Sequence, residues 1–159
     1  MATSLKNLSD FDSTSIPDAS ELSIGIVVAE WNIDVNTKML NGAVEVLQKH
    51  GVKSKNIFVN YVPGAFELTY GARIMAENYD VDAIITLGTV IQGDTPHFTY
   101  ICQSVSYGLT ELNLSYEIPF IFGVLTVNTL EQALERAGGK YGNKGSEVAV
   151  AAIKMALYN

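Results

Sequence analysis

The chain has 159 residues, a formal net charge of −7 and a pI near 4.7. This acidity argues against a nucleic-acid-binding protein, because such proteins depend on Lys and Arg contacts to phosphates. Its residues are 48% hydrophobic and 17% charged, and no apolar run approaches the roughly 20 residues of a membrane-spanning helix. We therefore expect no membrane association and a surface that is partly buried between subunits.

A single cysteine, Cys102, excludes an internal disulfide and fits a cytoplasmic location. We find no secretory signal and no metal-ligand spacing, and we expect no bound metal. Residues 1–20 are rich in Ser, Thr, Asp and Asn, which predicts a flexible arm. Phe11 and Ile16 of this arm could dock on a neighbouring subunit. Residues 21–159 are expected to form one domain.

Within that domain, apolar runs that are typical of strands alternate with segments of helical spacing. In chain order we predict a strand at 22–28, a helix at 34–50, a strand at 57–62, a helix at 66–78, a strand at 83–87, a helix at 97–112, a strand at 120–125, helices at 129–137 and 146–157, and a loop at 142–145 between these two helices. Such alternation favours a flavodoxin-like, three-layer α/β/α sandwich with a four-stranded parallel sheet.

The stretch 88–98 joins the third predicted strand to its helix and contains two glycines and an Asp-Thr-Pro helix start. Thr95 can cap the first turn, and Pro96 fits the first helical position. The free N–H groups of such a helix start favour an anion. His97 would lie beside that anion as a neutral imidazole, suited to proton transfer. A capping or surface histidine is the alternative interpretation.

Ligands of open parallel sheets bind beyond the carboxyl ends of the strands. Trp31 follows the first predicted strand, and Glu67 follows a Pro-Gly turn after the second. Trp31 could stack on a flat heteroaromatic ring or cover the core. Glu67 could bind a polyol or merely favour the helix dipole. Phe122 lies within the fourth strand, where core packing is the default.

Two further cations could contribute to an anion site. Arg136 could hold a phosphate in a forked geometry, and Lys144 could add a point charge. The alternative for both is a solvated cation near a helix end. The backbone of residues 93–95 could also cradle a phosphate, although Asp94 brings a negative charge to the same place.

The sequence resembles the lumazine synthase family of riboflavin biosynthesis over residues 24–157. The resemblance rests on Trp31-Asn32, on the run Val-Pro-Gly-Ala-Phe-Glu at 62–67, on residues 87–97, on Ile-Phe-Gly at 121–123, and on Glu-Gln-Ala-Leu-Glu-Arg-Ala-Gly at 131–138 with Gly-Asn-Lys-Gly at 142–145. It implies a condensation of 5-amino-6-(D-ribitylamino)uracil with 3,4-dihydroxy-2-butanone 4-phosphate. The products are 6,7-dimethyl-8-ribityllumazine, phosphate and two waters, and no cofactor takes part.

The resemblance also implies roles for individual residues. His97 would be the proton donor. The pyrimidine and its ribityl chain would contact Trp31, Ala65, Phe66, Glu67, Thr89, Val90, Ile91 and Phe122. The phosphate would contact Asp94, Thr95, Arg136 and Lys144. Phe122, Arg136 and Lys144 would come from an adjacent subunit, because sites of this family lie between subunits.

The resemblance implies a homo-oligomer. Members of the family form pentamers, and some assemble twelve pentamers into an icosahedral 60-mer. The short connection at 138–145 resembles that of the shell-forming members, so we predict the shell. An association with riboflavin synthase is also implied. One departure is Gln92, which stands where many members carry Arg or Lys.

Two other functions fit the same fold. One is a flavodoxin-like flavin carrier that binds flavin without turnover, because a fold alone does not fix a function. The other is a catalytically silent paralogue that serves as a shell or receptor, with Gln92 as its trace. Formation of the fluorescent lumazine product would separate the synthase from both.

Overall fold

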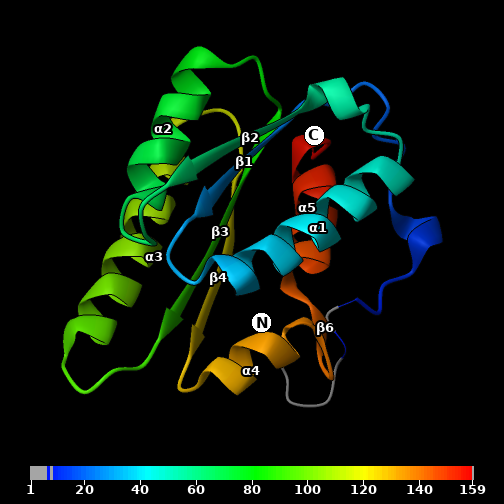
Figure 1. The fold of residues 1–159 in the computed structure, drawn as a ribbon. Coiled ribbons are helices and arrows are strands. Elements are labelled where there is room, and N and C mark those ends of the chain that lie inside the picture. Colours follow the sequence, from blue (N-terminus) through cyan, green and yellow to red (C-terminus); the bar gives the residue numbers. More distant parts are fainter. Residues whose placement is uncertain (1–6, 8, 159) are drawn as a thin grey trace.

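The computed structural model describes residues 7 and 9–158, and its centre is a four-stranded parallel sheet between two layers of helices (Figure 1). The strands lie in the order β2-β1-β3-β4. Their bounds are β1 Ile24–Ala29, β2 Ile57–Val62, β3 Ala83–Ile91 and β4 Phe120–Val127. The helices are α1 Ile33–Lys49, α2 Leu68–Asn78, α3 His97–Ser115, α4 Leu130–Glu135 and α5 Lys144–Ala156. The predicted α/β/α sandwich is therefore confirmed.

Two hydrophobic clusters fill the space on the two faces of the sheet. Helices α1 and α5 cover one face, and α2 and α3 cover the other (Figure 1). All six residues of β1 are buried, because side chains from this central strand pack into both clusters. This explains why its sequence is a continuous apolar run rather than an alternating one. No helix in the described part of the chain is long and apolar enough to cross a bilayer.

Strand β3 is longer than predicted. The glycine and polar residues after position 87 indicate a loop, but the structure continues the strand to Ile91. The extension pairs with β4, in a register that places Thr89 opposite Leu125 and Ile91 opposite Val127. Hydrogen bonds to a neighbouring strand here override the local sequence signal. As a result, part of the predicted functional stretch is a rigid strand.

The connection between α4 and α5 also differs from the prediction. Helix α4 ends at Glu135, and the predicted loop at 142–145 does not form as such. Instead, β5 (Ala137–Gly139) and β6 (Gly142–Asn143) pair as a short antiparallel hairpin, and α5 begins at Lys144. Gly138 and Gly142 have φ values of 107° and 81°, which favour glycine. Lys144 is thus the first residue of a helix rather than part of a loop.

The start of α5 packs tightly on α1. The side-chain oxygen of Asn143 accepts a hydrogen bond from the Gly145 N–H at 2.8 Å, and its amide donates to the Lys38 carbonyl at 2.9 Å. A Cβ on Gly145 would overlap the Met39 carbonyl. The two helices can approach this closely only with glycine at position 145.

The segment before β1 lies against the rest of the chain. Ile16 and Ala19 are buried in the cluster under α1 and α5, and Phe11 packs against that cluster. Phe11 and Ile16 therefore contact their own chain, and a contact with a neighbour stays a prediction. Residues 1–6 and 8 of the predicted arm lie outside the described residues. The flexibility of residues 1–20 stays a prediction.

Candidate active site

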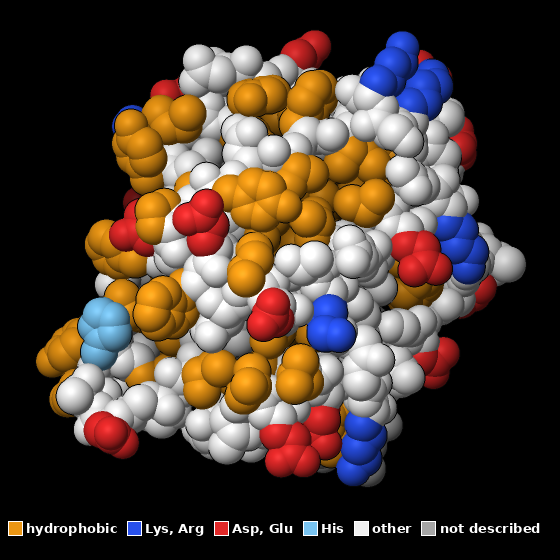
Figure 2. Space-filling model, in the orientation of Figure 1, with side chains coloured by type: hydrophobic (Ala, Val, Ile, Leu, Met, Phe, Trp, Pro, Cys, Tyr) orange, Lys and Arg blue, Asp and Glu red, His pale blue; other side chains and the backbone are white. Residues whose placement is uncertain are grey.

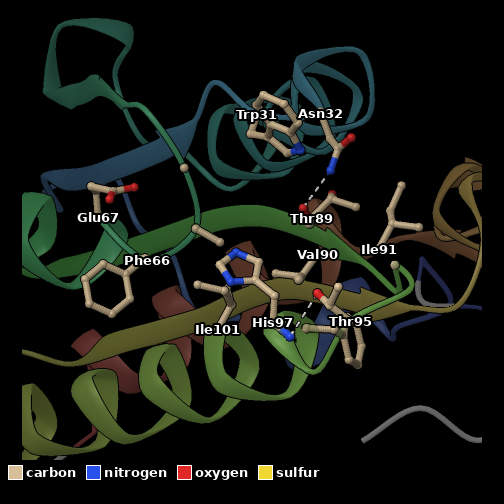
Figure 3. A pocket seen from close by; sticks show the side chains of 14 residues that line it. Trp31, Asn32, Phe66, Glu67, Thr89, Val90, Ile91, Thr95, His97 and Ile101 are labelled. Atoms are coloured by element: carbon tan, nitrogen blue, oxygen red, sulfur yellow. Dashed lines mark hydrogen bonds between the residues drawn. The ribbon is translucent and has the colours of Figure 1, made fainter.

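A cavity of about 710 Å³ opens where the carboxyl ends of β1, β2 and β3 meet the first turns of α3 (Figure 3). Its walls are mostly apolar, with a few polar groups directed into it. The residues that line it are Trp31, Asn32, Gly64, Ala65, Phe66, Glu67, Thr89, Val90, Ile91, Gly93, Thr95, His97, Phe98 and Ile101. A mainly apolar cleft with few polar groups is typical of small-molecule sites.

The turn between β1 and α1 carries Trp31 onto the rim of the cavity. Its side chain is 75% exposed, although Trp is among the most costly side chains to leave in water. Asn32 follows in a left-handed conformation with φ 64°. Its amide donates to the Thr89 carbonyl at 2.8 Å (Figure 3). The turn therefore holds an indole ring above the cavity and leaves its surface free to stack on a ligand.

The turn between β2 and α2 forms a second wall. Phe66 is 56% exposed and lies at the same mouth as Trp31 and His97 (Figure 3). Glu67 immediately precedes α2, and a Cβ on Gly64 would stand 3.1 Å from its carboxylate oxygen Oε2. Gly64 thus leaves room for the carboxylate at this turn. A second exposed aromatic ring beside an acceptor suits a flat ring that carries N–H or hydroxyl groups.

The last residues of β3 and the start of α3 complete the cavity. Thr89, Val90 and Ile91 form its floor, and His97 is the first residue of α3. The His97 backbone N–H donates to the Thr95 hydroxyl at 3.4 Å (Figure 3). Thr95 therefore makes the predicted capping contact, whereas Pro96 lies one residue before the helix rather than at its first position. The exposed imidazole can reach a ligand in the cavity.

The cavity brings together nine of the predicted site residues and leaves four outside its lining: Asp94, Phe122, Arg136 and Lys144. Asp94 is exposed in the loop between two lining residues. Phe122 stands on the edge strand β4 and is 37% exposed. It neither joins the core, as strand position alone suggested, nor lines the cavity of its own chain.

Arg136 and Lys144 lie together at the β5–β6 hairpin. The Lys144 backbone N–H donates to the Arg136 carbonyl at 2.8 Å. The Arg136 guanidinium donates to the Gln132 carbonyl at 3.0 Å and lies 4.9 Å from the centre of the Tyr141 ring. The Lys144 ammonium pairs with Glu147 at 2.7 Å. The backbone bond places the two residues next to each other, and the side-chain contacts hold each cation separately.

The cavity has an electrostatic gap. Among the described residues that line it, none is Lys or Arg, and Glu67 is acidic. The start of α3 offers N–H groups to an anion, but a phosphate that binds there has no full positive charge from this chain to balance it.

Comparison with known proteins assigns the chain to a family. The family model for 6,7-dimethyl-8-ribityllumazine synthase matches residues 21–159. Proteins of that name from Parabacteroides distasonis and Porphyromonas gingivalis are 59% and 55% identical to it, over 100% and 98% of this chain and 99% and 97% of their own lengths. The protein of that name from Cytophaga hutchinsonii is 54% identical, over 98% of this chain and 97% of its own.

The chain belongs to the 6,7-dimethyl-8-ribityllumazine synthase family. The matched range contains every residue that sequence reasoning proposed for the site. Gln92 stands outside the cavity lining, and its amide donates to the Gly93 carbonyl at 2.7 Å.

Sequence reasoning did not assign a role to several residues of this cavity. Phe98 and Ile101 line it without an assigned role, and Asn32 and Gly64, which also line it, were noted only as parts of longer motifs. Behind them lies Asn36, fully buried and bonded to Thr89. An asparagine within the apolar stripe of an amphipathic helix was the available signal for Asn36. Across the described residues, no group of three His, Cys, Asp or Glu side chains could hold a metal ion.

Proposed function

We propose that the protein condenses 5-amino-6-(D-ribitylamino)uracil with 3,4-dihydroxy-2-butanone 4-phosphate to 6,7-dimethyl-8-ribityllumazine, with release of phosphate and water. The observation that carries this proposal is the cavity at the carboxyl edge of the sheet, in a chain of the lumazine synthase family. Its exposed aromatic rings, acceptor groups and single imidazole match a flat, hydroxylated substrate and a reaction made of proton transfers.

The pyrimidine would occupy the apolar part of the cavity. Trp31 would stack on the ring, while Phe66 and Val90 enclose it. The backbone of Ala65, Thr89 and Ile91 would bind its polar edge and the ribityl chain, and the Glu67 carboxylate would accept hydrogen bonds from N–H or hydroxyl groups. The Thr89 hydroxyl already donates to Asn36 at 2.7 Å, so Thr89 would act through its backbone.

The phosphate would lie at the start of α3. The backbone amides of Asp94 and Thr95 and the Thr95 hydroxyl would donate to its oxygens. Arg136 and Lys144 of an adjacent copy would supply the positive charge that the lining of this cavity lacks, and Phe122 of that copy would close the pyrimidine side. In this arrangement the phosphate and pyrimidine sites are completed only in an assembly.

The reaction proceeds by addition and elimination. The substrate amine attacks the ketone carbon, and the ketone oxygen leaves as water to give an imine. Phosphate is then eliminated. Ring closure and loss of a second water complete the product. His97 lines this cavity and would exchange protons with the reacting oxygen and nitrogen atoms. Holding two reactants in one cavity would supply much of the acceleration.

Incubating both substrates with the purified protein should produce the green-fluorescent lumazine. Substituting His97→Ala should lower kcat by about 10²-fold, the lower end for general acid–base catalysis, because the substrate amine is itself a good nucleophile. The assembly should stay intact, since the His97 side chain is exposed. Tight flavin binding without product would instead support a flavin carrier. The absence of both flavin binding and product formation would support a silent paralogue.

We also propose a homo-oligomer with sites between adjacent subunits. Aromatic side chains such as Tyr70, Tyr100 and Tyr107 are more than 60% exposed on α2 and α3. Figure 2 shows hydrophobic side chains on the side of the molecule where these two helices lie. Exposed apolar surface of this kind favours contact with another protein surface.

The assembly is expected to be an icosahedral shell of twelve pentamers. Analytical ultracentrifugation of the purified protein should therefore find a particle with the mass of 60 chains. A single species with the mass of five chains would contradict the shell and would support a free pentamer.

We place the protein in the cytoplasm, with residues 1–20 as an arm on a single domain of residues 21–159. Because riboflavin synthase would consume the product, we also propose that the two enzymes associate.

A further inference from the structure

A buried hydrogen-bond network connects the turn that carries Trp31 to strand β3. Its centre is Asn36, in the first turns of α1, whose side chain is fully buried. The Asn36 amide donates to the Ala29 carbonyl at 2.6 Å and to the Trp31 carbonyl at 2.9 Å. Its oxygen accepts a hydrogen bond from the Thr89 hydroxyl at 2.7 Å. One side chain thus links the end of β1, the turn and the cavity floor.

A second contact reinforces the first. Asn32 has a left-handed backbone with φ 64°, and its side-chain amide donates to the Thr89 carbonyl at 2.8 Å (Figure 3). Thr89 is therefore bound through its hydroxyl to Asn36 and through its carbonyl to Asn32. On the other side, the Glu30 N–H donates to the Val62 carbonyl at 2.8 Å and the Trp31 N–H donates to the Pro63 carbonyl at 3.1 Å.

The position of the indole depends on this network. The Trp31 side chain is 75% exposed, so packing of the ring against the core contributes little to its placement. Its height above the cavity is fixed by the backbone of the turn, and that backbone is held by Asn36 and Asn32 on one side and Pro63 on the other. A buried amide with both its donor and its acceptor in use is a rigid support.

We propose that Asn36 is a positioning residue, which fixes Trp31 over the cavity by coupling the β1–α1 turn to Thr89. Asn36 touches no substrate in this arrangement. An apolar residue at this position would leave the Thr89 hydroxyl and the Trp31 and Ala29 carbonyls without their present partner. The inference rests on the proposed function only for the identity of the ring that Trp31 meets.

Trp31 is the sole tryptophan, so its fluorescence reports the turn directly and independently of activity. In the intact protein, Asn36→Ala should increase the fast component of the time-resolved anisotropy decay of Trp31. In steady-state assays, the same variant should raise KM for the pyrimidine about tenfold, a typical cost of a support removed from behind a binding residue. The KM for the phosphate substrate should change less than about twofold.

A second variant covers the case in which Asn36→Ala does not fold. Thr89→Val keeps the shape of the side chain and removes only the hydroxyl that donates to Asn36. It should shift the anisotropy and the pyrimidine KM in the same direction by a smaller amount. Where both variants fold, the double variant should resemble Asn36→Ala alone, because residues of one network do not act additively.

Asn113 offers a matched control. Its side chain makes three similar bonds of 2.9 Å, to the Leu109 carbonyl and to the carbonyl and N–H of Phe120, at the opposite end of the sheet. Asn113→Ala should leave the Trp31 anisotropy and the pyrimidine KM unchanged. The proposal is overturned if Asn113→Ala matches Asn36→Ala in both readouts, or if neither Asn36→Ala nor Thr89→Val alters the anisotropy. A wild-type protein without lumazine formation would refute the function, and the anisotropy would still decide this inference.

Discussion

Replacing Arg136 with alanine should raise KM for 3,4-dihydroxy-2-butanone 4-phosphate by about 10²-fold, while KM for the pyrimidine stays within about twofold. A hydrogen bond to a charged group contributes about 1.5–3 kcal/mol, and a forked guanidinium can make two to one phosphate. The guanidinium is held by the Gln132 carbonyl and the Tyr141 ring, so little ordering is required on binding. Initial-rate measurements with each substrate varied in turn would give both constants.

Arg73 provides the control for this experiment. Its guanidinium also lies over a tyrosine ring, at 5.3 Å from the centre of Tyr70, but on α2 and outside the cavity lining. Arg73→Ala removes the same charge and a similar contact, and it should leave both KM values near those of the wild type. Equal kinetic constants for Arg136→Ala and the wild type would show that this guanidinium does not bind the phosphate.

Co-assembled His97→Ala and Arg136→Ala subunits should be more active than either variant alone. If each site combines His97 of one copy with Arg136 of its neighbour, random mixing of equal amounts makes roughly a quarter of the sites complete. The activity of the mixture, reassembled from dissociated chains, should then approach about a quarter of the wild-type value. Activity equal to the mean of the two parents would place both residues in sites built from one chain.

A second mixture tests the geometry of the hairpin. The Lys144 N–H bonds to the Arg136 carbonyl, so both cations should serve the same neighbouring site. When Arg136→Ala subunits are mixed with Lys144→Ala subunits, each subunit supplies only one of the two cations to its neighbouring site. Every site in the mixture therefore lacks one cation. This mixture should show no gain over its parents. Complementation between them would mean that the two cations serve different sites.

The sequence was sufficient to predict the order of the elements, because each strand and helix carries its own periodicity. The prediction for β2 matches residues 57–62 in full. Strand β3 was predicted four residues too short, because pairing of Gly88–Ile91 with β4 is a tertiary effect. The β5–β6 hairpin was missed for a similar reason, since its two short strands have no periodicity from which to predict them.

The candidate site was predictable where its residues follow consecutive strands. Trp31, Glu67 and His97 each come just after a strand, and the parallel topology brings them to one edge. Asn36 could not be assigned a role from its spacing, because the groups that satisfy its side chain come from β1 and β3. The roles of Phe122, Arg136 and Lys144 depend on a neighbouring copy and stay predictions.

The bond from the Lys144 N–H to the Arg136 carbonyl, at 2.8 Å, joins the backbones from which the two cationic side chains extend. A shift of the β5–β6 hairpin would move the Arg136 and Lys144 side chains together, so that their contacts to an anion would form or break in a single step. The motion of the β5–β6 hairpin would then govern the release of inorganic phosphate after each turnover.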